Sequence, residues 1–188
     1  MNQHSLQLVA WAELALCWFA WLLASVRSRG KGPKPIIALS APGAWLGISL
    51  NIIGLSCLAV PYHPQGFQSS ILILVPAMVI APLSVRLVWK AQRHLGPHWH
   101  AGAVVNEDHV LIQTGPYKSI RHPIYASLLG MVFATGGVYT WWPFFVAGAI
   151  LNLFGIEIRA RAEERLLERF FQDEFIEYHS RSRAFFRF

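Results

Sequence analysis

Five long apolar runs alternate with polar segments along the chain. They cover residues 6–26, 43–60, 69–88, 123–139 and 141–158. A helix needs about 20 mainly apolar residues to cross a bilayer, so each run is predicted to be a transmembrane helix, although the last two are slightly short. Pro76 and Pro82 are expected to bend the third helix. The pattern predicts an all-α integral membrane protein in which residues 1–188 form a single membrane domain.

The first run, residues 6–26, has a cleavable signal peptide as an alternative interpretation. A signal peptide carries cations before its apolar core and small residues at a cleavage site, and the N-terminus has neither. We therefore predict a membrane-spanning helix. No small-xxx-small pattern dominates any one run, so the sequence predicts no particular oligomeric state.

Composition and charge placement strengthen the membrane prediction and add a topology. The chain is 54% hydrophobic and only 14% charged, whereas soluble domains are about 25% charged. Its 16 Lys and Arg residues fall in three segments, with four in 27–34, five in 86–121 and seven in 159–187. With five spans these segments share one side, which the positive-inside rule makes cytoplasmic, leaving the N-terminus outside. The net charge of +6 is then a topology signal, and we expect no nucleic-acid partner.

Two polar segments, residues 90–122 and 159–188, would therefore face the cytoplasm. In the second segment the apolar residues recur at helical spacing, as Leu167, Phe170, Phe171, Phe175 and Tyr178. This spacing predicts an amphipathic C-terminal helix at the membrane surface, which could continue the fifth span.

The most chemically dense stretch lies at residues 114–125, just before the fourth run. Gly115-Pro116 indicates a tight loop, and Pro123 suits the first position of a helix. Arg121 and His122 would then lie at a helix N-terminus, beside unpaired backbone donors that favour anions. Polar groups aimed at an apolar helix suggest a ligand site.

Several of these residues also have ordinary structural explanations. Arg121 would snorkel to the interface, and Tyr117 and Tyr125 would be interfacial aromatics. Glu163 and Glu164 would form a solvated helix turn paired with nearby arginines. The functional alternative is that one Glu holds ribose hydroxyls or a cationic cofactor, while the tyrosines wall an adenine or contact a sulfonium through cation–π attraction.

A histidine cluster raises the question of a metal. His94, His98 and His100 fall within seven residues, and His109 follows. Three imidazoles suit a metal, but no Cys or carboxylate ligand lies close in sequence. We predict a structured interfacial loop and no metal.

Taken in order, these elements resemble the isoprenylcysteine carboxyl methyltransferase family, especially its short prokaryotic members. The resemblance covers roughly residues 86–183. It rests on Leu95-Gly96-Pro97-His98-Trp99, Gly115-Pro116-Tyr117, Arg121-His122-Pro123-Ile124-Tyr125, Glu163-Glu164 and Phe171-Gln172-Asp173-Glu174-Phe175 with Tyr178. Two positions depart from the family pattern. Ser127 stands where Gly is frequent, and Gln172 replaces a usual Gly, so the fit of the substrate is in question.

The resemblance implies S-adenosylmethionine as the methyl donor, bound on the cytoplasmic side. It implies a cofactor site formed by His98, Trp99, Tyr117, His122, Pro123, Tyr125, Glu163 and Glu164. A prenylated lipophilic substrate would enter from the bilayer, between helices surrounded by membrane lipids. The location would be the cell inner membrane in a prokaryote and the endoplasmic reticulum in a eukaryote. Tyr125 and Glu164 must then lie close enough to touch one small molecule.

The implied reaction explains why the sequence offers few catalytic bases. A carboxylate is already anionic at neutral pH, so it can accept a methyl group without a general base. It needs a cation to hold it, and Arg159 is the first candidate and Arg121 the second. Three alternatives remain: a phospholipid or amine N-methyltransferase using His122 as a base, an NADPH-dependent membrane reductase, and a non-enzymatic scaffold.

Overall fold

The computed structural model describes residues 3–27, 37–38, 42–60, 62, 69–96, 104–105 and 110–185. The secondary-structure elements of this part of the chain are helices, apart from one antiparallel pairing of two-residue strands and an isolated β-bridge. The elements in chain order are α1 (Gln3–Arg27), β1 (Ile37–Ala38), α2 (Pro42–Leu58), α3 (Ile71–Leu95), β2 (Val104–Val105), the 3₁₀ helix η2 (Gly115–Lys118), α4 (Pro123–Val138), α5 (Trp142–Phe171) and α6 (Asp173–Arg181). A helix lies at each of the five apolar runs.

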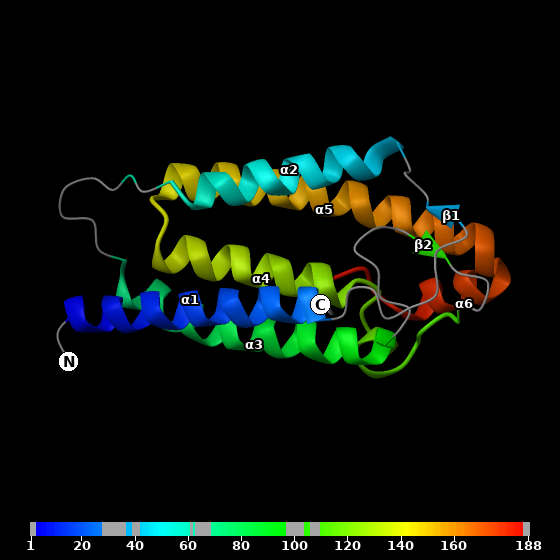
Figure 1. The fold of residues 1–188 in the computed structure, drawn as a ribbon, viewed down its shortest axis with the longest axis horizontal. Helices are drawn as coiled ribbons and strands as arrows, with labels where there is room; N and C mark the ends of the chain where they lie inside the picture. Colours follow the sequence, from blue (N-terminus) through cyan, green and yellow to red (C-terminus); the bar gives the residue numbers. More distant parts are fainter. Residues whose placement is uncertain are drawn as a thin grey trace.

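The long helices form two groups that run roughly parallel to one another (Figure 1). Helix α2 packs along α5, while α4 packs along α3 and α1 covers both α3 and α4. The contact between α4 and α5 is less extensive than that of α2 with α5 or that of α3 with α4. Helix α6 and the paired strands lie together at one end of the bundle (Figure 1).

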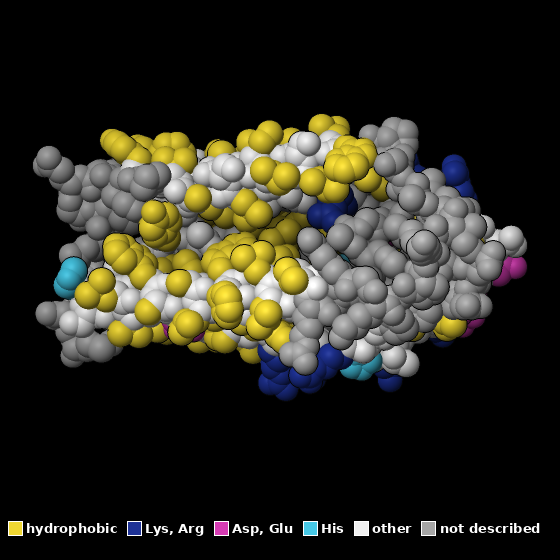
Figure 2. All heavy atoms as spheres, in the orientation of Figure 1, with side chains coloured by type: hydrophobic (Ala, Val, Ile, Leu, Met, Phe, Trp, Pro, Cys, Tyr) yellow, Lys and Arg dark blue, Asp and Glu magenta, His cyan; other side chains and the backbone are white. Residues whose placement is uncertain are grey.

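Three helices are long and apolar enough to cross a membrane: Gln3–Val26, Ile71–Leu95 and Trp142–Phe171. The apolar helices Ala44–Leu58 and Pro123–Val138 are shorter. Figure 2 shows apolar side chains along the length of the helices, with most charged side chains at the end that carries α6. A surface this apolar needs a lipid environment, as expected for an integral membrane protein.

A repeated motif holds α2 against α5. Gly47, Asn51 and Gly54 on α2 have the same Gly-x₃-Asn-x₂-Gly spacing as Gly148, Asn152 and Gly155 on α5. The helices are antiparallel, so a Cβ on Gly47 would lie 2.7 Å from the Gly155 carbonyl oxygen and one on Gly148 would lie 2.7 Å from the Gly54 carbonyl oxygen. The Asn51 amide donates to the Asn152 carbonyl at 3.1 Å. This spacing is not the small-xxx-small pattern considered in the sequence analysis. It acts within the chain and is visible only when the two runs are compared.

Indole groups hold α1 to α4. The Trp18 indole donates to the Thr135 hydroxyl at 3.0 Å, and the Trp21 indole donates to the Ser127 hydroxyl at 3.1 Å. Ser127 is fully buried and donates in turn to the Ile124 carbonyl. Its hydroxyl is therefore occupied by helix packing. At this departure from the family pattern, the Ser127 side chain therefore helps to hold α1 against α4.

The predicted amphipathic helix is split in two at Gln172. Helix α5 continues without a break to Phe171, and α6 then starts in a new direction. Phe175 and Tyr178 are buried against Leu111, because α6 folds back onto the protein. Phe170 remains exposed. Leu167 and Phe171 pack against the same cluster as Phe175 and Tyr178, so four of the five stripe residues meet as predicted, but on two helices rather than one.

The break is at a strained residue, which leads to a stability prediction. Gln172 has φ 46° and ψ −119°, and is the only non-glycine residue with positive φ among those the structure describes. Gly96, at the end of α3, has nearly the same conformation, φ 53° and ψ −125°. Glycine adopts this conformation without the steric cost, which is about 1–3 kcal/mol for other residues.

We expect Gln172→Gly to raise the free energy of unfolding by about 1 kcal/mol, after the larger unfolded-state entropy of glycine is subtracted. Gly96→Ala should lower it by a similar amount through backbone strain alone, because nothing lies within 4 Å of the added Cβ. Denaturant unfolding in detergent measures both. A destabilised Gln172→Gly protein would contradict the strain assignment.

Candidate functional site

The loop before α4 is shaped by a close contact between Gly115 and His94. Gly115 has φ 58°, and a Cβ there would clash with the imidazole ring of His94. The His94 ring donates from Nδ1 to the Lys90 carbonyl oxygen at 2.8 Å. His94 thus acts as a packing partner of the loop. The other three histidines of the cluster lie outside the described residues.

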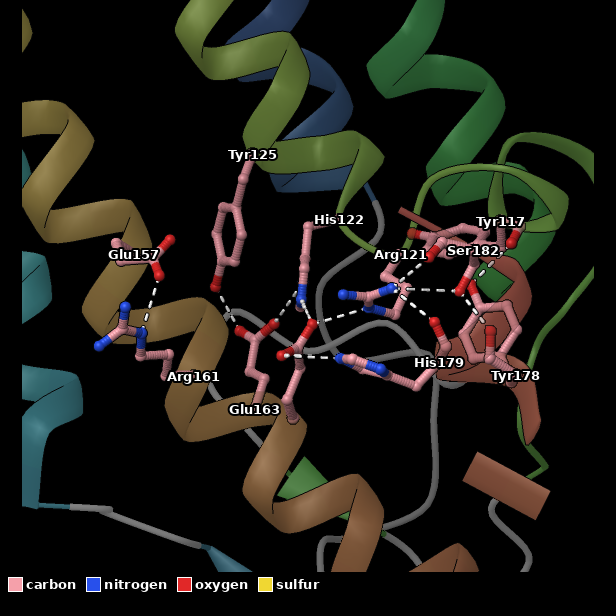
Figure 3. A network of polar contacts seen from close by, with 11 residues as sticks. Tyr117, Arg121, His122, Tyr125, Glu157, Arg161, Glu163, Tyr178, His179 and Ser182 are labelled. Carbon is pink, nitrogen blue, oxygen red and sulfur yellow. Dashed lines mark hydrogen bonds and ion pairs between the residues drawn. The ribbon is translucent and has the colours of Figure 1, made fainter. Parts of the chain in front are cut away.

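His122 and Pro123 start α4 as the sequence predicted. Pro123 is the first residue of the helix and His122 is its N-cap, which confirms the predicted helix start. The His122 imidazole is 5% exposed, and its ring faces the carboxylates of α5 (Figure 3). The α4 N-terminus therefore delivers a buried imidazole to a site shared with α5.

Two adjacent carboxylates on α5 meet His122 from one side. Glu164 Oε1 lies 3.0 Å from His122 Nε2 and 2.8 Å from Arg121 Nε. Glu163 Oε2 lies 3.5 Å from His122 Nδ1. Glu164 is thus held by two cations, whereas Glu163 is less tightly engaged. The two carboxylates have different environments although they are neighbours in sequence.

Tyr125 connects this network to the end of the apolar bundle. Its hydroxyl donates to Glu163 Oε1, and its ring stacks on that of His122 at 5.6 Å between centroids. The Arg159 guanidinium carbon lies 4.8 Å from the centre of the Tyr125 ring. Tyr125 and Glu164 both contact His122, so the two residues lie on the same side of the bundle and close together. That one small molecule touches both remains a prediction.

Arg121 points away from Tyr125, toward the C-terminal end of the chain (Figure 3). Besides Glu164, its Nη1 donates to the carbonyl oxygens of Ser182 at 2.5 Å and His179 at 3.1 Å. The Arg121 guanidinium thus holds the residues at the end of α6 to Glu164 of α5.

The ion pairs set the protonation states of the network. Burial lowers the pKa of His122, but its hydrogen bonds to Glu163 and Glu164 raise it more, to about 9. Burial raises the pKa of Glu164, but hydrogen bonds from His122 and Arg121 lower it to about 2. At neutral pH the imidazolium and the Glu164 carboxylate are therefore both charged.

This network predicts a loss of stability in alkali. Because the folded pKa of His122 lies above its ordinary value of 6.5, its contribution is complete below pH 6.5 and disappears as the pH rises through about 9, by at most about 3 kcal/mol. Denaturant unfolding should show that the free energy of unfolding of the wild type falls across this pH range, and that it falls less for His122→Asn. Equal dependence on pH in the two proteins would contradict the raised pKa of His122.

Of the other residues predicted to form the cofactor site, one lies within the described part of the chain and two lie outside it. Tyr117 is buried in η2, and its carbonyl oxygen accepts the Tyr178 hydroxyl at 2.6 Å; burial raises the pKa of Tyr117. This places Tyr117 in a neighbouring cluster around α6. His98 and Trp99 lie outside the described residues.

The structure also brings in residues that the sequence analysis missed. His179 Nε2 lies 3.9 Å from Glu164 Oε2, and the Phe185 ring lies 5.8 Å from that of His122. A cavity of about 380 Å³ borders Glu164 on the α6 side, lined by Arg161, Glu164, Arg165, Glu168, Phe175, Ile176 and His179. The sequence marks this region only by its aromatic residues near the C-terminus. Such a pattern does not reveal that Phe185 contacts His122, because the two residues are far apart along the chain.

Comparisons with known proteins match the part of the chain that contains these residues. The model of the isoprenylcysteine carboxyl methyltransferase family matches residues 73–169, which include Arg121, Tyr125, Arg159 and the two glutamates. The uncharacterized protein YpbQ of Bacillus subtilis is 28% identical over 94 residues, or 50% of this chain and 55% of that protein. The chain thus spans about half the length of this curated relative.

Proposed function

Because the chain belongs to the isoprenylcysteine carboxyl methyltransferase family, we propose that it is a membrane methyltransferase that uses S-adenosylmethionine to methylate the carboxylate of an isoprenylcysteine-like lipophilic acceptor. The observation that carries this proposal is the meeting of Arg159, Tyr125 and Glu163 where the apolar helices end. A lipid-borne acid and a water-soluble donor would meet at such a boundary.

The residues present fit the proposed methyl donor. The Tyr125 ring contacts two cationic side chains, Arg159 and His122, so it already takes part in the cation–π attraction that a sulfonium would use at the edge of this cluster. Glu163 lies farther from His122 than Glu164 does and is 27% exposed, so it is the better candidate for ribose hydroxyls or a cationic group. Glu164 instead holds Arg121 and His122 in place.

The proposed reaction needs positioning more than acid–base catalysis. Bound S-adenosylmethionine would supply an electrophilic methyl group on a sulfonium. The acceptor carboxylate is anionic at neutral pH, so the residues around it need to bind it, align it and exclude water. Arg159 is suited to holding it, since its side chain lies where α5 meets both Tyr125 of α4 and Gly47 of α2.

The charge on His122 argues against an amine acceptor. An amine must lose a proton before or during methylation, and a base near neutrality serves this best. With its pKa raised to about 9 by two carboxylates, His122 is an imidazolium at pH 7 and has no lone pair to offer. A carboxylate acceptor is therefore favoured over a phospholipid or other amine.

The topology belongs to the same proposal. Five spans with the N-terminus outside would bring residues 90–122 and 159–188 to the cytoplasmic side, where a water-soluble donor is available. The concentration of Lys and Arg in these segments supports this arrangement through the positive-inside rule.

Two measurements test the proposed function with the full-length protein in detergent or lipid nanodiscs. Calorimetry with S-adenosylhomocysteine should show binding, which a scaffold or an NADPH-dependent reductase would not. Methyl transfer from labelled donor should then favour a prenyl-cysteine or another lipophilic acid over a lipid amine. Absence of binding would reject the methyltransferase, and preference for the amine would reject the carboxylate acceptor.

A further inference from the structure

The four residues that follow α6, Ser182 to Phe185, lie along the loop that carries Arg121 and His122. We call them the C-terminal strap. The Arg183 amide donates to the Ser119 carbonyl at 3.0 Å, and the Arg121 amide donates to the Arg183 carbonyl at 2.7 Å. The His122 amide donates to the Ala184 carbonyl at 3.0 Å. The strap therefore pairs with the loop in parallel, and Ile120 and Arg183 form a β-bridge.

The strap also orients the Arg121 side chain. Arg121 Nη1 donates to the Ser182 carbonyl at 2.5 Å and lies 3.4 Å from the Ser182 hydroxyl oxygen. That hydroxyl donates to the Tyr178 carbonyl at 2.5 Å, which fixes Ser182 to the end of α6. The guanidinium that binds Glu164 is thus aimed by backbone groups of the strap.

Phe185 anchors the strap in the site. Its ring lies 5.8 Å from the His122 ring at an angle of 39°. It packs on the apolar cluster of Tyr125, Leu128, Leu129, Ile156 and Ala160, which joins α4 to α5. Through this single side chain, the strap touches both the imidazole and the two helices that provide the site.

The strap is attached to the end of α6, to the loop of Arg121 and His122, and through Phe185 to one apolar cluster. Ordering these four residues costs backbone entropy, which the contacts offset. A terminal segment outside the helix bundle opens at a lower free energy than the core of a protein. A ligand that needs Arg121 and His122 in their present positions would therefore hold the strap down, and by reciprocity the docked strap would tighten the ligand.

We propose that the C-terminal strap is a positioning element of the methyl donor site, and that Phe185 is the positioning residue through which it holds His122. This inference rests on the proposed function for the identity of the ligand. Binding of the donor and docking of the strap are coupled, so each strengthens the other.

Limited trypsin cleavage tests the coupling directly. The strap contains the Arg183–Ala184 bond and begins after Arg181, and both arginines are exposed. In the full-length protein, saturating S-adenosylhomocysteine should slow cleavage at these bonds by about tenfold or more, a population shift typical of ligand linkage, with cleavage after the exposed Arg93 of α3 as the internal control. An unchanged rate while calorimetry shows binding would overturn the strap proposal alone. Absence of binding would overturn the proposed function and, with it, the coupling.

Substitutions distinguish positioning from general stability. Phe185→Ala should raise the KM for the methyl donor by about tenfold, and leave the KM for the acceptor within about twofold. Phe185→Leu, which keeps the apolar anchor, should restore most of the loss. Arg183→Pro removes the donor to Ser119 and should resemble Phe185→Ala. The control is Phe170→Ala, since Phe170 is exposed on α5. Equal changes in both KM values, without rescue by Leu, would show a merely structural role and overturn the proposal.

Discussion

Replacing Arg159 with alanine should raise the KM for the lipophilic acceptor by about 100-fold, equivalent to about 3 kcal/mol for a lost charge-assisted hydrogen bond. The change should appear in KM, with kcat altered by less than about threefold. The reason is that the acceptor carboxylate loses its charge as the methyl group arrives, so Arg159 binds the ground state at least as well as the transition state. Steady-state kinetics with a prenyl-cysteine acceptor measure both constants.

The donor side provides the control for this experiment. The affinity for S-adenosylhomocysteine, measured by calorimetry, should change by less than about threefold in Arg159→Ala. Arg169→Ala removes a cation from an exposed position further along the same helix and should leave the KM for the acceptor unchanged. If a folded Arg159→Ala protein lost donor and acceptor binding equally, the assignment of Arg159 to the carboxylate would be rejected.

Glu164→Gln should lower the free energy of unfolding by about 3 kcal/mol, the second large effect. The substitution keeps the size of the side chain but removes the carboxylate from Arg121 and His122, whose side chains are 9% and 5% exposed. Breaking a buried ion pair on one side leaves an uncompensated charge in a poorly solvated place. Denaturant unfolding at neutral pH measures the loss, and the pKa of His122 should fall in the same protein.

A carboxylate on the same helix supplies a matched control. Glu157 pairs with Arg161 at 2.7 Å, but both side chains are exposed, and such surface pairs contribute about 0.5 kcal/mol. Glu157→Gln should therefore be nearly neutral. A loss in Glu164→Gln no larger than in Glu157→Gln would show that Glu164 does not hold Arg121 and His122 in place.

Local sequence patterns predicted the parts of the fold that depend on local chemistry. The five apolar runs each contain a helix, because a run of apolar residues can satisfy its backbone groups in lipid only within a helix or a closed barrel. Pro123 starts α4 as predicted, because its fixed φ and missing amide hydrogen suit the first helical position. Whether all five helices cross the bilayer remains a prediction.

What the sequence could not provide are the pairings between distant segments. The split of roles between Glu163 and Glu164 depends on Arg121, more than 40 residues away. The hydrogen bond from Arg121 to the C-terminal strap depends on a parallel pairing of two short segments. No hydrophobic periodicity in the sequence indicates this pairing. The turn at Gln172 has only an indirect signal, which is the glycine usual at this position in the family. A residue with a side chain does not by itself indicate a positive φ in the way that glycine does.

The two helix groups give the polar network a mechanical role. His122 and Tyr125 belong to α4, which packs with α1 and α3, whereas Arg159 and the two glutamates belong to α5, which is bound to α2 by glycine contacts. Bilayers of different thickness tilt the helices they surround, and a slip of one residue along a helix is about 1.5 Å, enough to separate the Tyr125 hydroxyl from Glu163. The charged cluster thus joins the two helix groups at one end of the bundle, and a change in bilayer thickness that shifts one group against the other would first disturb the contacts of Tyr125 and Glu163.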